Sequence, residues 1–225
     1  MRLKKLLQLI LLVKLLKKNN LNYLNAILKL LILGSLSFSQ VKYELDTNKS
    51  TLHWYGYKVT GQHDGNVNIN NGYVILNSSS SIISDAYIEI DMNSISVSDI
   101  KSEKWNKKLV NHLKDDDFFS VSDYPVSSLK VLSQVHPDNL VVYDRKDKYS
   151  EILYNCLITI KGIENIIRVP ITISKSNETL FASGTIKLDR TLWDIKYKSQ
   201  KYFASLEDRV IYDDFMIDFS LYVNE

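Results

Sequence analysis

Alternation of apolar and polar residues is the feature that most constrains how this chain can fold. In Ile88-Glu89-Ile90-Asp91-Met92 the apolar side chains fall at every second position, and residues 214–223 repeat the pattern near the C-terminus. Successive side chains of a β-strand point to opposite faces. Each such segment therefore predicts a strand with one buried face and one solvated face.

About eight such strands are expected, enough to form a closed sheet. The predicted strands are residues 51–59, 73–77, 88–92, 126–135, 149–161, 166–174, 180–189 and 214–223. A short connection at 162–165, which contains a glycine, suits an antiparallel hairpin. Closing about eight strands into a barrel removes the exposed edges. We therefore predict an all-β fold, an antiparallel eight-stranded barrel.

A short helix is expected to interrupt the strands, because apolar residues recur at spacings of three and four in 102–113. One side of this predicted helix carries Trp105, Leu109, Val110, His112 and Leu113. Adjacent phenylalanines follow, Phe118 and Phe119. We expect that they do not both point inward and that at least one is a buried anchor. Pro125 cannot continue a helix and favours an extended Tyr124, so the next strand should begin after it.

The first 39 residues differ in composition from the rest of the chain. They hold seven Lys or Arg and no acidic residue, whereas the whole chain has 28 basic and 26 acidic residues. The remainder, 40–225, therefore has 21 basic residues and a net charge of −5. Its lysines are scattered, so a nucleic-acid partner is not expected, since phosphate binding needs clustered basic residues.

Residues 30–39 predict a secretory signal, because an apolar run fades into small residues with Ser37 and Ser39 before the expected cleavage at Gln40. We expect a leader of 1–39, a single domain of 40–225, and a periplasmic or secreted product. The earlier apolar run, 6–16, contains Gln8 and Lys14 and is too short to cross a bilayer of roughly 30 Å. No stable membrane span is expected in the mature form. The alternative is membrane anchoring through an uncleaved amphipathic leader.

No metal, cofactor or catalytic motif is expected. The histidines at 53, 63, 112 and 136 lack the paired spacing of metal ligands, and structural roles are favoured for His63 and His112. Cys156 is the single cysteine, so it cannot form an intramolecular disulfide, and its place on an alternating apolar face suits a small core residue.

Small residues on predicted inner faces leave two outcomes open. Ala182 and Gly184 stand beside Ile186 and Leu188, and further glycines fall in or next to other strands. They add little volume, which favours an internal cavity in a barrel of this size. They are equally consistent with bulges or corners of a filled barrel.

An ordered set of short motifs resembles the YceI-like family of lipid and polyisoprenoid binding proteins across almost all of 40–225. The matching segments are Tyr43-Glu44-Leu45-Asp46 with Ser50 and Trp54, His63-Asp64-Gly65 with Gly72, 90–95, His112-Leu113 with Phe118-Phe119 and Tyr124-Pro125, 157–162 with Val169-Pro170, Asp189-Arg190-Thr191-Leu192-Trp193, and 208–217. The asparagine-rich run 65–72 and the long leader depart from the family pattern.

The resemblance implies a lipocalin-like barrel with one helix, exported to the periplasm, that encloses an apolar tunnel for an isoprenoid or similar lipid. The motif positions taken as structural are His63, Gly65, His112, Leu113, Phe118, Phe119, Tyr124, Pro125 and Arg190. The inner faces of the predicted strands give the candidate lipid-binding residues, which are Ile88, Ile90, Met92, Ile158, Ile160, Ile171, Ile173, Phe215, Ile217 and Phe219.

The sequence thus favours non-enzymatic carriage or sequestration of an elongated apolar lipid, polyisoprenoid or quinone-like. One alternative is an enzyme acting on a lipid or quinone at the barrel mouth, with His63 or His112 beside an acid. Another is a filled barrel that serves as an interaction module. The oligomeric state stays open, a homodimer included.

Overall fold

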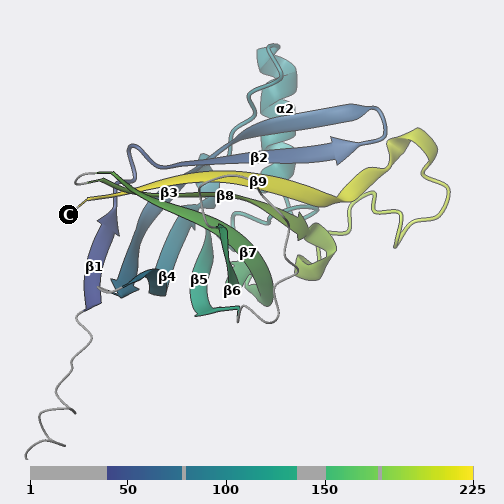
Figure 1. Cartoon of the computed structure of the whole chain (residues 1–225). Coiled ribbons are helices and arrows are strands. Elements are labelled where there is room, and N and C mark those ends of the chain that lie inside the picture. The colour runs from purple at the N-terminus through teal and green to yellow at the C-terminus, as the bar shows by residue number, and fades with distance from the viewer. Residues whose placement is uncertain (1–39, 78–79, 136–150, 177–178, 225) are drawn as a thin grey trace, which may run out of the picture. The chain divides into compact units, whose positions relative to one another are not determined.

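The computed structural model describes residues 40–77, 80–135, 151–176 and 179–224 (Figure 1). The predicted leader, His136 and the first residues of the strand predicted at 149–161 lie outside these ranges. The strands are β1 Gln40–Leu45, β2 Thr51–Lys58, β3 Gly61–Asn77, β4 Ser80–Asp91, β5 Val126–Gln134, β6 Glu151–Ile160, β7 Ile163–Ser176, β8 Thr179–Asp189 and β9 Ile211–Asn224. The α-helix among them is α2, Glu103–Lys114, and 3-10 helices cover Met92–Ser94, Arg190–Trp193 and Glu207–Arg209.

Eight of the strands form a closed antiparallel ring. Hydrogen bonding runs from β2 through β9, β8, β7, β6, β5 and β4 to β3, and β3 pairs with β2 to close it. β1 is an additional strand that pairs with β3 and, at Glu44 and Leu45, with the end of β9. The prediction of an all-β antiparallel eight-stranded barrel with one short helix is confirmed.

β3 is much longer than the strand predicted at 73–77. Its first part is the asparagine-rich run, in which Val67 and Ile69 are buried while Asn66, Asn68 and Asn70 are exposed. The alternation is therefore present, with asparagines in the outward positions where other strands carry charges. The register shifts between Ile69 and Asn71, which marks a bulge.

The β6–β7 hairpin is tighter than predicted. Ile160 pairs directly with Ile163, so the turn is Lys161-Gly162 rather than 162–165. Both turn residues are left-handed, with φ of 50° and 70°, as in the two-residue turns that match the twist of the flanking strands. Glu164 and Asn165 consequently belong to β7.

The predicted helix is present, but its buried side differs from the prediction. Trp105 is 54% exposed, whereas Asn106 donates hydrogen bonds to the carbonyls of Val97 and Ile100, 2.8 and 3.0 Å away. These bonds fix the first turn of α2 against the preceding loop, which turns Trp105 outward. Leu109 and Val110 pack against the core and Leu113 is buried.

The interior is one apolar core lined by the inward face of each ring strand. Tyr154, Cys156, Ile158 and Ile160 alternate inward along β6, and Leu188 and Trp193 are almost fully buried at the end of β8 and just after it. Within the described ranges, no helix has the length and apolar character needed to cross a bilayer.

Candidate functional site

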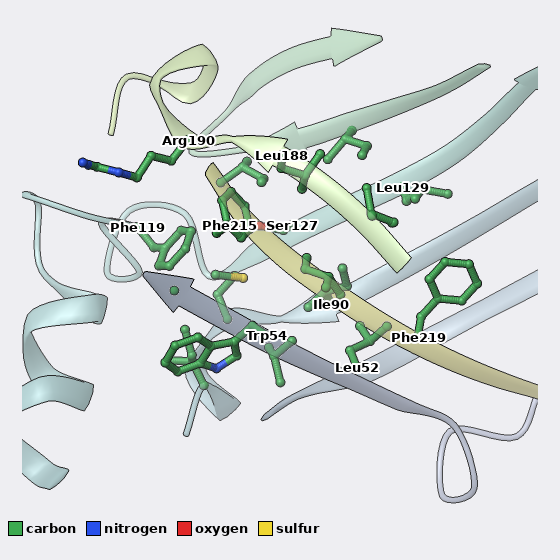
Figure 2. Close-up of a pocket in the computed structure, with 18 of the residues that line it drawn as sticks. Leu52, Trp54, Ile90, Phe119, Ser127, Leu129, Leu188, Arg190, Phe215 and Phe219 are labelled. Carbon is green, nitrogen blue, oxygen red and sulfur yellow. The ribbon is translucent and has the colours of Figure 1, made fainter. Parts of the chain in front are cut away.

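A cavity of 170 Å³ lies inside the barrel, and its wall is almost entirely carbon (Figure 2). Ring strands line it together with Leu113, Phe118 and Phe119 of the segment between β4 and β5. One water needs about 10–15 Å³ by the same measure, so the cavity has room for about a dozen water-sized groups. Phe118 is buried, as expected of at least one of the two phenylalanines, and Phe119 is half-buried. Both line the cavity, so the prediction that they do not both point inward is wrong. They lie in a series of turns rather than in a strand, so strand alternation does not apply to them.

Nine of the ten candidate lipid-binding residues line this cavity. They are Ile88, Ile90, Met92, Ile158, Ile160, Ile171, Phe215, Ile217 and Phe219. The tenth, Ile173, lines a second cavity of 40 Å³ instead. Their role in binding a ligand stays a prediction.

Trp54 and Leu52 of β2 also line the cavity, although they were not among the candidate wall residues. The Trp54 indole N–H donates to the Ser96 carbonyl at 3.1 Å, which fixes the ring in the wall. Their spacing of two in the predicted strand is the sequence signal that places both side chains on one face.

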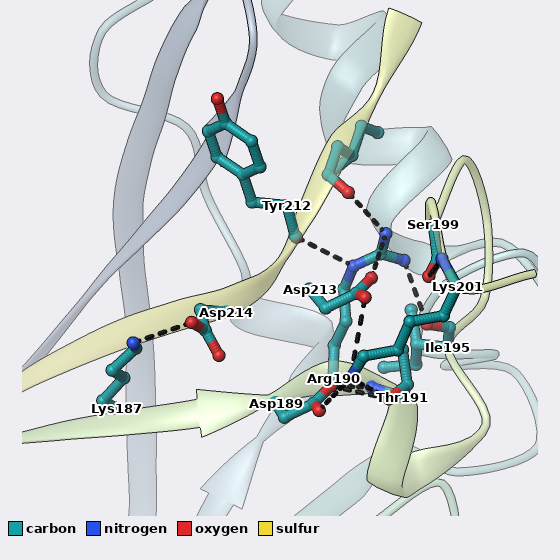
Figure 3. Close-up of polar contacts among 11 residues, drawn as sticks. Lys187, Asp189, Arg190, Thr191, Ile195, Ser199, Lys201, Tyr212, Asp213 and Asp214 are labelled. Atoms are coloured by element: carbon teal, nitrogen blue, oxygen red, sulfur yellow. Dashed lines mark hydrogen bonds and ion pairs between the residues drawn. The ribbon is translucent and has the colours of Figure 1, made fainter. Parts of the chain in front are cut away.

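Arg190 lies at one end of the cavity, and Figure 2 shows its guanidinium pointing away from the apolar side chains. The residue is 4% exposed. Its N–H groups donate to the carbonyls of Tyr212, Ile195 and Ile211 at 3.1, 2.9 and 3.0 Å (Figure 3). Burial lowers the Arg190 pKa, and the nearby Asp213 and Asp189 carboxylates oppose that shift.

Two carboxylates, Asp213 and Asp189, act on this guanidinium. Asp213 Oδ1 lies 3.2 Å from Arg190 Nη2, close enough for an ion pair but without hydrogen-bond geometry. Asp189 accepts from the backbone N–H of Thr191 at 2.9 Å and from Lys201 Nζ at 2.6 Å. Burial acts to raise the Asp189 pKa, but these bonds outweigh it and the pKa is lowered. The cluster joins the ends of β8 and β9, which is a structural role.

The two motif histidines lie in separate clusters. His63 Nδ1 is 2.8 Å from Asp99 Oδ2, and His63 Nε2 is 3.2 Å from Lys58 Nζ. Burial acts to raise the Asp99 pKa, but hydrogen bonds led by that from His63 lower it overall. Among the residues described, neither His63 nor His112 lines the cavity, and no group of three or more His, Cys, Asp and Glu could hold a metal ion.

His112 packs edge-on against Phe118 and Tyr197, with ring centroids 4.9 and 4.6 Å away. It therefore holds the end of α2 against the segment that follows the Arg190–Trp193 turn.

The remaining motif positions make close backbone contacts. A Cβ on Gly65 would lie 1.8 Å from the Ser96 carbonyl oxygen, so only glycine fits there. A Cβ on Gly162 would lie 2.8 Å from the ring of Tyr124, and the Pro125 carbonyl accepts from the Met92 N–H at 3.0 Å. These contacts place the Tyr-Pro motif between β4 and the β6–β7 turn.

The fold and this cavity define a class of protein: closed antiparallel barrels with an apolar interior and a helix outside the ring. A family model described as "YceI-like domain" matches residues 43–223. The chain belongs to the YceI-like family.

Solved structures share the fold. BcnA of Burkholderia cenocepacia is 15% identical, with 79% of this chain and 98% of that chain covered and a TM-score of 0.57. A polyisoprenoid binding domain from Saccharophagus degradans, described as implicated in plant cell wall breakdown, is also 15% identical, with 81% and 97% covered and a TM-score of 0.56. No curated protein matches the chain.

Proposed function

We propose that the protein binds, carries or sequesters an elongated apolar lipid, such as a polyisoprenoid or a quinone with an isoprenoid tail, inside its barrel. The observation that carries this proposal is the cavity of 170 Å³ with an almost purely carbon wall. The relative from Saccharophagus degradans, a polyisoprenoid binding domain of the same fold, supports the same ligand class.

Hydrophobic transfer is enough to drive this binding. Enclosing roughly 400 Å² of apolar ligand surface at about 25 cal/mol per Å² gives on the order of 10 kcal/mol before the costs of immobilisation. The donors of Arg190, the cation at the cavity end, are directed to backbone carbonyls. The ligand is therefore held by its hydrocarbon part, and a polar head group contributes little.

A role without chemistry is favoured over the enzyme alternative. The two histidines considered as general bases have other partners, Asp99 for His63 and aromatic rings for His112. Neither is placed to abstract a proton from a molecule inside the cavity, since neither belongs to its wall.

We further propose that residues 1–39 are a secretory leader removed before Gln40, so that the barrel domain 40–225 acts in the periplasm or outside the cell. N-terminal sequencing of protein from the cell envelope tests this. Recovery of a membrane-bound form that retains residues 1–39 would instead support an uncleaved anchor.

Lipid carriage is tested by purifying the protein from a bacterial host, extracting it with organic solvent and identifying any lipid by mass spectrometry. Stripped protein is then reloaded with linear isoprenoid alcohols and examined by native mass spectrometry. We expect a stoichiometric apolar ligand that survives chelator treatment. Failure to retain any lipid under all loading conditions would refute the proposal and favour a filled interaction module.

A further inference from the structure

Two cavities inside the barrel share one wall. The large cavity of 170 Å³ and the small cavity of 40 Å³ have four lining residues in common: Ile88, Leu129, Ile171 and Leu221. They come from β4, β5, β7 and β9, four strands of the ring. Ile88 and Leu129 are direct cross-strand partners. These four residues form a partition across the interior.

The two cavities lie toward opposite ends of the barrel. The large cavity reaches Phe118 and Arg190, close to the end of α2. The small cavity is lined by Leu45 of β1, the part of β3 that pairs with β1, and the start of β8. The surface exposed to it is apolar, and the side chains facing it include Leu76, Ile83, Ala86, Leu180, Ala182 and Val223. Tyr73 also lines it, but its hydroxyl donates to Asp85 at 3.0 Å. Among the described residues that line it, no polar atom is therefore exposed to the cavity to recognise a head group.

We propose that the small cavity is the binding site for the far end of the ligand's hydrocarbon chain, and that the partition sets the chain length the protein accepts. This inference rests on the lipid carriage proposed above. Each partition side chain is aliphatic, so its displacement breaks no hydrogen bond and only exchanges van der Waals contacts with the protein for contacts with the ligand. The ligand end that enters is an unsubstituted linear isoprenoid or alkyl terminus, because a buried polar terminus would be left without a partner.

Leu129 offers the cleanest test. It is half-buried, whereas the other three partition residues are buried. Leu129→Ala removes most of one partition side chain and joins the two cavities. Ile158→Ala is the matched control, because Ile158 pairs with Leu129 across the strands but lines the large cavity alone. Ala182→Leu adds side-chain volume that fills part of the small cavity, and Ala182 does not line the large cavity.

The probes are geraniol, farnesol and geranylgeraniol, each one isoprene unit longer than the last, and binding is compared by native mass spectrometry and calorimetry. Circular dichroism first confirms that each variant is folded. We expect Leu129→Ala to shift the preferred alcohol by at least one isoprene unit toward longer chains, with a tenfold or greater gain for the longer probe. Ile158→Ala should leave the preferred length unchanged. Adding Ala182→Leu to Leu129→Ala should restore the original preference.

Two results would overturn the inference while leaving lipid carriage intact. One is an unchanged length preference in folded Leu129→Ala. The other is an equal shift in Ile158→Ala, which would mean that total volume rather than the partition determines length. If neither the unmodified protein nor any variant binds any of the alcohols, the proposed function fails and the partition proposal fails with it.

Discussion

The contact between Gly65 and the segment that follows β4 gives the sharpest stability prediction. An alanine Cβ at position 65 would lie 1.8 Å from the Ser96 carbonyl oxygen and 2.9 Å from Cζ2 of Trp54. Cβ atoms essentially never approach other heavy atoms closer than 3.0 Å. Gly65→Ala therefore forces Ser96 away from β3 by more than an ångström.

The cost follows from the bonds that Ser96 makes. Its backbone N–H donates to the Asn66 carbonyl at 2.9 Å, and its own carbonyl accepts from the Trp54 indole at 3.1 Å. Its hydroxyl also donates to the Asn66 carbonyl, at 3.1 Å. Losing two or three bonds at about 1 kcal/mol each, with about 1–3 kcal/mol for overpacking, predicts a loss of about 3–6 kcal/mol in the free energy of unfolding.

Gly56→Ala in the neighbouring strand is the control. A Cβ there would meet only Cζ3 of Trp54, at an ordinary contact distance of 3.8 Å. Removing a strand glycine should be neutral or stabilising by roughly 0.5–1 kcal/mol. Urea denaturation of both variants decides the matter. Equal effects, or a loss below about 1 kcal/mol for Gly65→Ala, would refute the argument that this close approach requires glycine.

Three further predictions concern the cavity, the aromatic segment and acid stability. Ile217→Glu should abolish lipid retention because it places a carboxylate in an apolar wall, whereas Asp218→Asn on the opposite face should retain lipid. Solvent extraction and mass spectrometry of the folded variants compare their lipid content. Full lipid content in Ile217→Glu would contradict the inner-face assignment. Phe118→Ala should lower the free energy of unfolding by about 3–5 kcal/mol and Trp105→Ala by less than about 1 kcal/mol, because Phe118 is buried and Trp105 is exposed. Thermal or chemical unfolding measures both losses. Similar losses in the two variants would contradict the assignment of Phe118 as the buried anchor. The lowered pKa of Asp189 means that its contribution to stability is fully present above its unfolded pKa of about 3.9 and is lost as pH falls through the lower folded value. Asp189→Asn should therefore flatten the decline in stability below about pH 4, and an unchanged slope in unfolding titrations would count against the assignment.

Strand alternation predicted the fold well where outward positions carry charges. In β9, Phe215, Ile217 and Phe219 line the cavity, as their alternation with polar or outward residues predicted, so both the strand and its inner face followed from the sequence. The first half of β3 was missed because its outward residues are asparagines and its inward positions include glycines. β1 was missed because it is short and four of its six residues are exposed.

The parts of the site that could not be predicted depend on contacts between distant segments. The carbonyl acceptors of Arg190 lie on Ile195, Ile211 and Tyr212, and only the folded chain brings them together. Whether small residues leave a cavity depends on how neighbouring side chains pack, which composition does not determine. Trp105 faces outward because Asn106 makes two hydrogen bonds to the preceding loop. Asn106 is polar, so the spacing of apolar residues gave no sign of this role.

The buried thiol of Cys156 can report how often the barrel wall opens. It is fully buried in β6, and burial raises its pKa to about 12. At pH 8 about one thiol in ten thousand would then be the reactive thiolate, and a reagent cannot reach it while the strands around it are closed. The rate at which a thiol reagent modifies the native protein therefore measures how often this wall opens. A molecule that binds the interior of the closed barrel stabilises that state and so slows the modification of Cys156. Unlabelled compounds can therefore be ranked by how much each one slows this modification.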